Sequence, residues 1–443
     1  MRRAAYRTFS AAHALESRFA RRCTPAGRLV IAALFASMII GPNTRLTVAY
    51  QAFTFLLALL LIAVALSVRR PPRLSVRRAL PRFATAGVPF VYRLRVGHAG
   101  QRLERGLLLT EELADPRPSL AEFLSAVEPG EERRNRFDRA VGYPRWAWLV
   151  SRNRRARIVE QPLPPLPPGT EIEVRVEVTP RARGSLRFAG VTVARPDPLA
   201  LMKSPLVLDL PGSVLVLPRR YPLPAIELPG ARRYQHGGIA LASSVGDSEE
   251  FLSLREYRPG DPLRRIHWRS WARAGVPIVK EYQDEFFVRH GLILDTFVTG
   301  AVGPRFEEAV SVAASFAAVV DTHESLLDLM FVGAQTYCFT AGRGVGQADR
   351  MLEVLAGVTP CQAHPFSTLS GLVLERRAAL SGCICVLLAW DDERRRLVDT
   401  LRAHGVPTLV LVVDDAPAAA PAPDEAGIHR LVPGRIAEGL ARL

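Results

Sequence analysis

The sequence predicts a multi-domain protein with an N-terminal transmembrane helical hairpin, a β-sandwich-like middle region and a C-terminal α/β domain. Three observations predict this architecture: two uncharged apolar stretches near the N-terminus, period-two alternation in the middle, and alternating strand-like and helix-like segments after residue 286. The chain has 443 residues, 48% of them hydrophobic and 23% charged. This composition is sufficient for packed cores and excludes a wholly disordered chain.

The formal net charge is +15, and nearly all the positive charge is arginine, since the lysines are Lys203 and Lys280. This skew weakens any inference from charge to the class of partner. The five cysteines contain no C-x-x-C spacing, so we expect reduced core thiols rather than a disulfide scaffold or a zinc ribbon.

A transmembrane hairpin is predicted over residues 29–68, after a basic cytoplasmic N-terminus at residues 1–28. No charged residue lies between Arg45 and Arg69. At about 1.5 Å per residue this stretch forms a helix of about 34 Å, enough to cross a hydrocarbon core of about 30 Å. The first apolar segment, from Leu29 to Gly41, is shorter, about 20 Å as a helix.

Arginines flank the outer sides of this hairpin, with Arg2, Arg3, Arg7, Arg18, Arg21, Arg22 and Arg28 before it and Arg69, Arg70, Arg73, Arg77 and Arg78 after it. The positive-inside rule then places both ends, and the bulk of the chain, in the cytoplasm. Two alternatives take the first segment as part of a signal peptide or as a surface-lying segment, and either could export the bulk.

Residues 74–230 are predicted to form a β-rich domain. Short alternating runs such as Phe90 to Val96 and Thr170 to Val178, broken by Pro and Gly, are typical of half-buried antiparallel strands. An Arg-rich insertion from Glu131 to Arg157 carries two tryptophans. It is either a nucleic-acid or lipid-headgroup surface, or a solvated loop with a few aromatics beneath it.

A dense cationic and aromatic cluster lies in residues 235–285. Its members are Arg255, Tyr257, Arg258, Pro259, Gly260, Asp261, Arg265, His267, Trp268, Arg269 and Arg273. The pattern predicts a turn at Pro259-Gly260-Asp261, a short helix from Leu263 to Arg273, and a strand from Ile278 to Tyr282. The segment could hold an anionic partner, or it could be a clasp in which arginines pair with Asp261, Glu256 and Glu281.

Residues 286–443 alternate between apolar strands and amphipathic helices, for example a helix from Phe306 to Val320 and a strand from Thr408 to Val413, as in a parallel sheet covered by helices. Asp295 and Asp391 each end a predicted strand, and ligands of open α/β sheets bind at that edge. Two carboxylates with nearby hydroxyls would suit Mg²⁺, Mn²⁺ or Ca²⁺. Alternatively, both residues cap the segments that follow them.

The sequence contains few other motifs that indicate catalysis. It contains no G-K-[ST] phosphate loop, no H-E-x-x-H motif and no nucleophile elbow, so we expect no catalytic residues and no enzymatic activity.

The run from Arg255 to Asp261, followed by Arg265-Ile266-His267-Trp268-Arg269 and Ala272-Arg273-x-Gly275, resembles the hallmark of the bacterial family called domain of unknown function 58. The resemblance implies a membrane hairpin, a β-rich region and a von Willebrand factor A-like (Rossmann-like) C-terminal domain. It also implies association with MoxR-type AAA+ ATPases and other A-like proteins. One departure is Trp271, where the family usually has Ser or Thr.

In von Willebrand A-like domains a metal site uses two acids and two hydroxyls. By that resemblance Asp295 and Asp391 match the acids, Thr299 stands at one hydroxyl, and Thr368 or Ser367 could supply the other. Phe297 stands where the first serine would be, and a phenyl ring cannot coordinate Mg²⁺ or Mn²⁺.

The sequence therefore predicts a membrane-anchored cytoplasmic protein of the bacterial inner membrane. The resemblance implies that it is a scaffold or interaction protein, with a MoxR-type ATPase as partner in assembly or maturation of envelope-associated complexes. The alternatives are a metal-assisted hydrolase that uses Asp295 and Asp391, and a basic binder of nucleic acid or anionic lipid. Nucleic acid is the less expected partner.

Overall fold

The computed structural model describes residues 2–40, 47–68, 72–224, 251–261, 263, 266–282, 288–298, 303–319, 325–342, 347–414 and 427–443. The chain divides into two compact units. The first contains Met1–Arg220, Val298–Ala314 and Leu352–Thr359, and the second contains Tyr221–Phe297, Ser315–Met351 and Pro360–Leu443.

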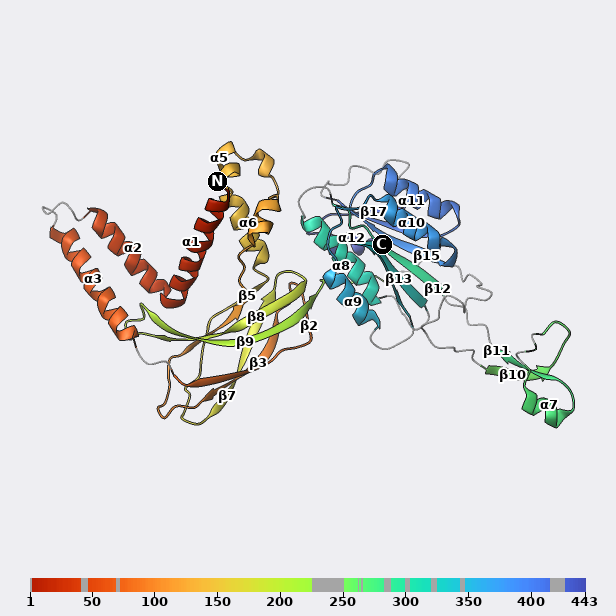
Figure 1. Cartoon of the computed structure of the whole chain (residues 1–443), viewed down its shortest axis with the longest axis horizontal. Helices are drawn as coiled ribbons and strands as arrows, with labels where there is room; N and C mark the ends of the chain where they lie inside the picture. The colour runs from red at the N-terminus through yellow and green to blue at the C-terminus, as the bar shows by residue number, and fades with distance from the viewer. Residues whose placement is uncertain are drawn as a thin grey trace. The chain divides into compact units, whose positions relative to one another are not determined.

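Three helices open the chain: α1 (Arg2–Arg22), α2 (Pro25–Ile40) and α3 (Thr47–Ser67). Within α3, Val48–Ser67 is the one described segment that is long and apolar enough to cross a membrane, whereas the apolar part of α2 is shorter. Helices α2 and α3 pack side by side (Figure 1). Helix α1 was not expected, because its apolar residues are divided between two faces.

The β-rich region has two sheets, which confirms the prediction of a β-rich middle. One sheet has the order β1-β3-β7-β5 and the other β2-β9-β8-β4-β6. The strands are β1 (Leu74–Ala79), β2 (Phe83–Thr85), β3 (Phe90–His98), β4 (Leu108–Leu113), β5 (Ala156–Ile158), β6 (Gln161–Pro162), β7 (Glu171–Pro180), β8 (Gly184–Pro196) and β9 (Lys203–Leu217). Inward residues of both sheets, among them Leu94, Val176 and Val193, form one shared core.

The segment between β4 and β5, which contains the Arg-rich insertion, folds as helices rather than as the loop considered above. They are α4 (Leu120–Ser125), α5 (Arg136–Val141) and α6 (Tyr143–Asn153), with a 3₁₀ turn at Glu131–Arg133. Ser119 and Glu122 form a capping box that fixes the start of α4. Trp146 and Phe123 are buried in a small core of their own, against which Tyr6 and Phe9 of α1 pack.

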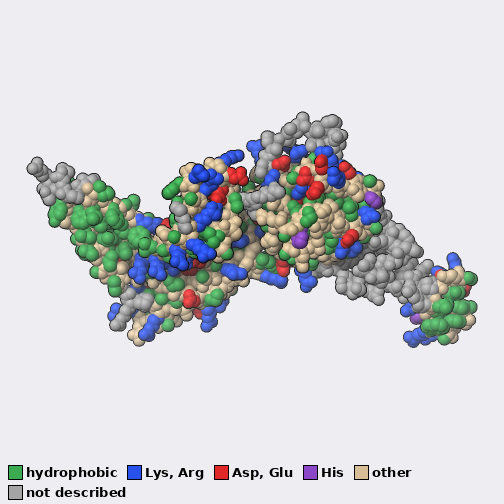
Figure 2. Space-filling model, turned by 45° about the horizontal axis from the view of Figure 1, so that its top comes forward, with side chains coloured by type: hydrophobic (Ala, Val, Ile, Leu, Met, Phe, Trp, Pro, Cys, Tyr) green, Lys and Arg blue, Asp and Glu red, His purple; other side chains and the backbone are tan. Residues whose placement is uncertain are grey.

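The second unit begins with a hairpin of β10 (Phe251–Glu256) and β11 (Ile278–Tyr282), between which lies α7 (Trp268–Ala274). We call residues 251–282 the signature module. Figure 2 shows hydrophobic side chains gathered on it, with basic side chains beside them.

A six-stranded sheet follows, with the order β14-β13-β12-β15-β16-β17. Its strands are β12 (Val288–Leu294), β13 (Ser325–Val332), β14 (Thr336–Ala341), β15 (Gly382–Leu387), β16 (Thr408–Val413) and β17 (Ile428–Leu431). Only β14 at the edge runs antiparallel to its neighbour. The helices of this part of the chain are α8 (Pro304–Val319), α9 (Gln347–Gly357), α10 (Ser367–Arg376), α11 (Asp392–Ala403) and α12 (Ile436–Leu440).

Candidate functional site

The order of strands reverses on either side of β12, because β13 lies beside it on one side and β15 on the other. Such a reversal leaves a crevice at the carboxyl ends of the strands, the usual ligand position in open α/β sheets. Asp295 follows β12 directly, and Asp391 precedes α11 as its N-cap residue. The structure thus places both acids at the edge that the sequence predicted.

A single guanidinium, that of Arg394, bridges the two carboxylates. Arg394 Nε donates to Asp295 Oδ2 at 2.6 Å, and Arg394 Nη1 pairs with Asp391 Oδ2. Asp295 is 0% exposed, and it also accepts hydrogen bonds from the backbone N–H groups of Phe297 at 2.9 Å and Leu388 at 3.0 Å. Both carboxylates therefore have partners from the chain itself.

Aromatic rings cover this ion pair. The guanidinium of Arg394 lies 4.6 Å from the centre of the Phe366 ring, and Phe366 meets Phe297 edge to face at 5.5 Å. Burial acts to lower the pKa of Arg394, but its hydrogen bond to Asp295 and the nearby carboxylate charges act more strongly and raise it. Arg394 is therefore a fixed cation.

These residues do not fit a divalent cation. Mg²⁺ and Mn²⁺ need several free oxygen ligands, whereas both carboxylates already bind a guanidinium and Phe297 presents a ring. Within the described ranges, no cluster of three or more His, Cys, Asp or Glu side chains could hold a metal. Thr299 lies outside the described residues, and Thr368 lies in the first turn of α10. Metal binding stays a prediction, and this donor set gives it no support.

Capping, the alternative role of these acids, is observed at Asp391. Its Oδ1 accepts a hydrogen bond from the backbone N–H of Arg394 at 3.0 Å. Arg394 and Phe366 were not recognised in the sequence. The available signal was the Asp391-x-x-Arg394 spacing at the start of a predicted helix, where residues three apart share a face.

In the signature module, Arg255 and Asp261 form a two-pronged ion pair. Arg255 Nη1 and Nη2 each donate to an oxygen of Asp261 at 2.8 Å, and the backbone N–H of Arg258 donates at 2.8 Å. The hydrogen bond from Arg255, followed by that from Arg258, lowers the pKa of Asp261 to about 2. Gly260 has a φ of +108°, which few other residues adopt. The predicted clasp is thus present between Arg255 and Asp261.

The helix of the module is shorter than expected. We predicted it from Leu263, but α7 begins at Trp268, and the backbone of Ile266 pairs with Val279 of β11 instead. The N–H of His267 donates to the carbonyl of Ile278 at 2.8 Å. His267 Nδ1 lies 2.7 Å from Ser270 Oγ, which fixes the ring against the first turn of α7.

The other predicted members of the cluster lie on or next to α7 and the turn. Arg258, Pro259, Gly260, Arg269 and Arg273 are exposed, Tyr257 is half-buried, and Arg265 lies outside the described residues. Trp268 stacks on Trp271 with ring centres 5.3 Å apart, yet it remains 66% exposed. Leu254, Leu263 and Val276 are exposed apolar neighbours in the same module.

Comparison with known proteins finds a family match over the segment that contains both sites. Residues 253–423 match the model of the family described as "Protein of unknown function DUF58". The uncharacterized protein YeaD of Bacillus subtilis (strain 168) is 28% identical over 185 residues, which are 41% of this chain and 44% of YeaD. The chain thus aligns with less than half of this relative. The match confirms the resemblance for that segment.

Two solved structures resemble parts of the chain only weakly. The CARDB domain of a Pyrococcus furiosus protein, in complex with di-metal ions, is 14% identical and covers 33% of this chain and 89% of its own, with a TM-score of 0.18. A mutant of Salmonella alpha-2-macroglobulin is 13% identical and covers 36% of this chain and 8% of its own, with a TM-score of 0.19. Likenesses at this level carry no argument.

Proposed function

We propose that this chain is a membrane-anchored scaffold or interaction protein that binds a protein partner through the signature module. The partner class that we propose is a MoxR-type AAA+ ATPase, with other von Willebrand A-like proteins as further partners, in assembly or maturation of envelope-associated complexes. The bulk of the chain lies in the cytoplasm in this proposal.

The exposed apolar surface of the signature module is the observation that carries the proposal. A two-stranded hairpin with a helix of seven residues is too small to bury such side chains in a core of its own. Trp268, Leu254, Leu263 and Val276 remain exposed beside Arg258 and Arg269. Tryptophan and arginine dominate the binding energy of protein interfaces, and exposed apolar patches mark such interfaces.

The clasp supports the same function. Arg255 and Asp261 hold the turn after β10 in one conformation, so little conformational freedom is lost when a partner binds the module. The half-buried Arg255 is committed to this internal pair. The exposed arginines at the turn and on α7 are therefore the ones that we assign to the partner.

Membrane anchoring rests on α3, whose length and apolar composition suit a span, and on the shorter apolar helix α2. Both helices expose large apolar side chains, among them Leu29, Ile39, Phe55 and Leu61, as lipid-facing helices do. The arginines on the outer sides of this pair support a two-span anchor in a bacterial inner membrane with both ends in the cytoplasm.

A von Willebrand A-like identity for the C-terminal sheet is supported by its strand order, with the first strand, β12, near the centre and an antiparallel edge strand, β14. The resemblance noted above implies that von Willebrand A-like domains bind partners through a metal. In this chain the Arg394 guanidinium takes that central position, so we propose that partner binding does not use a metal.

The rival function, a metal-assisted hydrolase, requires Asp295 and Asp391 to hold a cation or to move protons. Both acids are held by Arg394, and Asp295 has no exposed surface. This arrangement favours the interaction protein.

The test is co-purification of the tagged full chain from membranes of cells that also produce a defined MoxR-type ATPase. We expect the ATPase to co-purify with the wild-type chain and to be at least tenfold depleted with Trp268→Ala. Val207→Ala, which truncates an exposed valine on β9, is the matched control and should retain the ATPase. Equal recovery with Trp268→Ala, or none with the wild type, would overturn the proposal.

A further inference from the structure

Helix α1 has two apolar faces, and only one of them packs against the folded chain. On the inner face, Tyr6 lies 5.8 Å from Phe123 and Phe9 lies 6.0 Å from Trp146, measured between ring centres. These contacts fix α1 on the helical insertion of the β-rich region.

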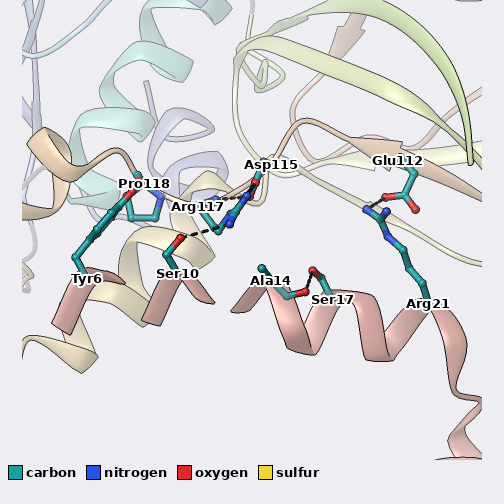
Figure 3. A network of polar contacts seen from close by, with 9 residues as sticks. All are labelled: Tyr6, Ser10, Ala14, Ser17, Arg21, Glu112, Asp115, Arg117 and Pro118. Atoms are coloured by element: carbon teal, nitrogen blue, oxygen red, sulfur yellow. Dashed lines mark hydrogen bonds and ion pairs between the residues drawn. The ribbon is translucent and has the colours of Figure 1, made fainter. Parts of the chain in front are cut away.

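Polar contacts fix the same face along the whole helix (Figure 3). Tyr6 Oη donates to the carbonyl of Pro118 at 3.0 Å, Arg117 Nη1 donates to Ser10 Oγ at 3.3 Å, and Arg21 pairs with Glu112 at 2.9 Å. Because contacts occur near both ends and in the middle, the rotation of α1 about its axis is set.

The outer face of α1 presents an unpartnered apolar strip. Leu15 is 70% and Phe19 41% exposed, and they are four residues apart, so they lie on one side of the helix. Ala4, Ala11 and Ala12 are exposed on the same side. The helix carries six arginines and one glutamate. This is the composition of a helix that lies in the surface of an anionic bilayer.

The position of α1 along the chain also places it near the membrane surface, because α1 immediately precedes the apolar helix α2. The chain turns between α1 and α2 at Cys23 and Thr24, which are buried under the turn between β8 and β9. Thr24 N donates to the carbonyl of Leu201 at 3.1 Å, and Gly27 N donates to Thr24 Oγ1 at 3.0 Å. The start of the apolar helix α2 is therefore fixed to the β-rich region.

The two helices form a V that meets at this corner, with α5 and α6 on one side of α1 and α2 on the other (Figure 1). Helix α1 therefore does not continue the axis of α2 away from a membrane. Its outer face, opposite the insertion, lies on the side of the apolar helices. Figure 2 shows basic side chains gathered where these apolar helices join the rest of the first unit.

We infer that α1 lies in the headgroup layer of an anionic bilayer, with Leu15 and Phe19 at the boundary of the acyl chains. The inference rests on the proposed membrane anchoring by α2 and α3. Leu15 precedes Pro25 by about 15 Å of helix, whereas the headgroup layer is about 5–8 Å thick. Leu15 therefore reaches the bilayer only if α1 inclines toward the membrane plane, as the V allows.

Arg18 and Arg22 flank the apolar strip and would contact lipid phosphates. Arginines near an anionic surface are attracted to it, and salt weakens this attraction. The consequence is that the β-rich region is held against the membrane by a whole helix as well as by its connection to α3.

The experiment measures the depth of spin labels on the full chain in vesicles. Single cysteines replace Leu15, Ile62 of α3 or Val91 of β3, all of them exposed side chains, in a Cys338→Ser background. The other four cysteines are buried. The vesicles are phosphatidylcholine with phosphatidylglycerol at three to one, or phosphatidylcholine alone. Collision with a water-soluble relaxation agent and with oxygen gives the depth of each label.

In the anionic vesicles we expect residue 62 in the acyl core, residue 15 at the headgroup boundary, and residue 91 in water. Residue 15 should become at least threefold more accessible to the water-soluble agent in phosphatidylcholine alone, or with Arg18→Gln and Arg22→Gln. Residue 62 in the core with residue 15 as accessible as residue 91 would overturn the inference and leave the anchoring intact. Residue 62 in water would overturn the anchoring itself.

Discussion

Replacement of Arg394 by methionine tests whether the centre of the α/β crevice is a closed ion pair. The substitution keeps most of the side-chain volume and removes the charge that faces Asp295 and Asp391. Removing one partner of a buried pair costs about 3–5 kcal/mol, because the other charge stays buried without compensation. Asp295 keeps two backbone hydrogen bonds, so we expect the lower end, about 3 kcal/mol.

Hydrogen–deuterium exchange of the full chain in detergent micelles measures this loss locally. About 3 kcal/mol corresponds to an opening equilibrium about 150-fold larger, since about 1.36 kcal/mol is a factor of ten. We therefore expect faster exchange of peptides that cover β12 and β15, with β7 of the other unit as the internal reference. Native-state exchange resolves such local differences in stability.

A second variant separates charge from packing. Asp295→Asn combined with Arg394→Met removes both charges, so it should recover much of the protection that Arg394→Met alone loses. If Arg394→Met changed exchange by less than twofold, Arg394 would not hold Asp295 in the folded protein. If the double variant exchanged as fast as the single one, the loss would come from packing and the reasoning from charge would be refuted.

Four further expectations concern three separate parts of the chain. Mg²⁺ or Mn²⁺ should leave the thermal unfolding of the full chain unchanged, because Asp295 is already paired, and a calorimetric titration checks this. Arg78 and Glu111 are a buried ion pair 3.1 Å apart, and Arg78→Ala should cost less than the loss of about 3–5 kcal/mol typical of such a pair, because Glu111 can take up a proton when it loses its partner; Glu111→Gln should cost less still. Burial raises the pKa of Glu111 in the folded protein. The protonated Glu111 therefore stabilises the fold fully below the pKa of the unfolded state, and this stabilisation is lost as pH rises through the pKa of the folded state. Urea unfolding from about pH 4 to 8 measures the change in the free energy of unfolding. Gly27→Ala should destabilise the first unit, because a Cβ would overlap the Leu201 carbonyl, and limited proteolysis measures this.

The outcomes that contradict these expectations are distinct. A saturable rise in unfolding temperature with Mg²⁺ that Asp295→Ala abolishes would revive the metal site. Greater loss with Glu111→Gln than with Arg78→Ala would mean that the carboxylate is stabilising when ionised. Gly371→Ala, at an open position in α10, is the control for Gly27→Ala and should be neutral or slightly stabilising. Equal protease resistance of Gly27→Ala and the wild type would exclude the close approach of α2 to Leu201.

Much of the fold could be predicted where one face of an element is buried. Strand β16 has the predicted bounds, Thr408–Val413, because a short apolar run before a turn has few other solutions. Helix α8 was expected from Phe306 and begins at Pro304 for a similar reason. Helix α1 was missed because its apolar residues lie on two faces, so that no single stripe of period 3.6 is visible.

The candidate site was predicted only in part, for a different physical reason. Strand ends set the positions of Asp295 and Asp391, so sequence pattern located both acids. Arg394, in the first turn of α11, fills the space between the two acids. The direction of its side chain could not be predicted, because hydrophobic patterns do not determine it. Phe366 comes from a loop before α10, and its contact with Arg394 depends on tertiary packing.

Site-specific photo-crosslinking from residue 268 tests the proposed function most directly. A photoreactive amino acid replaces Trp268 in the full chain, or Val207 as the control, in cells that produce a defined MoxR-type ATPase at its normal level. The account predicts a crosslink between position 268 and the ATPase that position 207 does not give. Crosslinks from position 268 only to the same chain, or equal crosslinks from both positions, would contradict it.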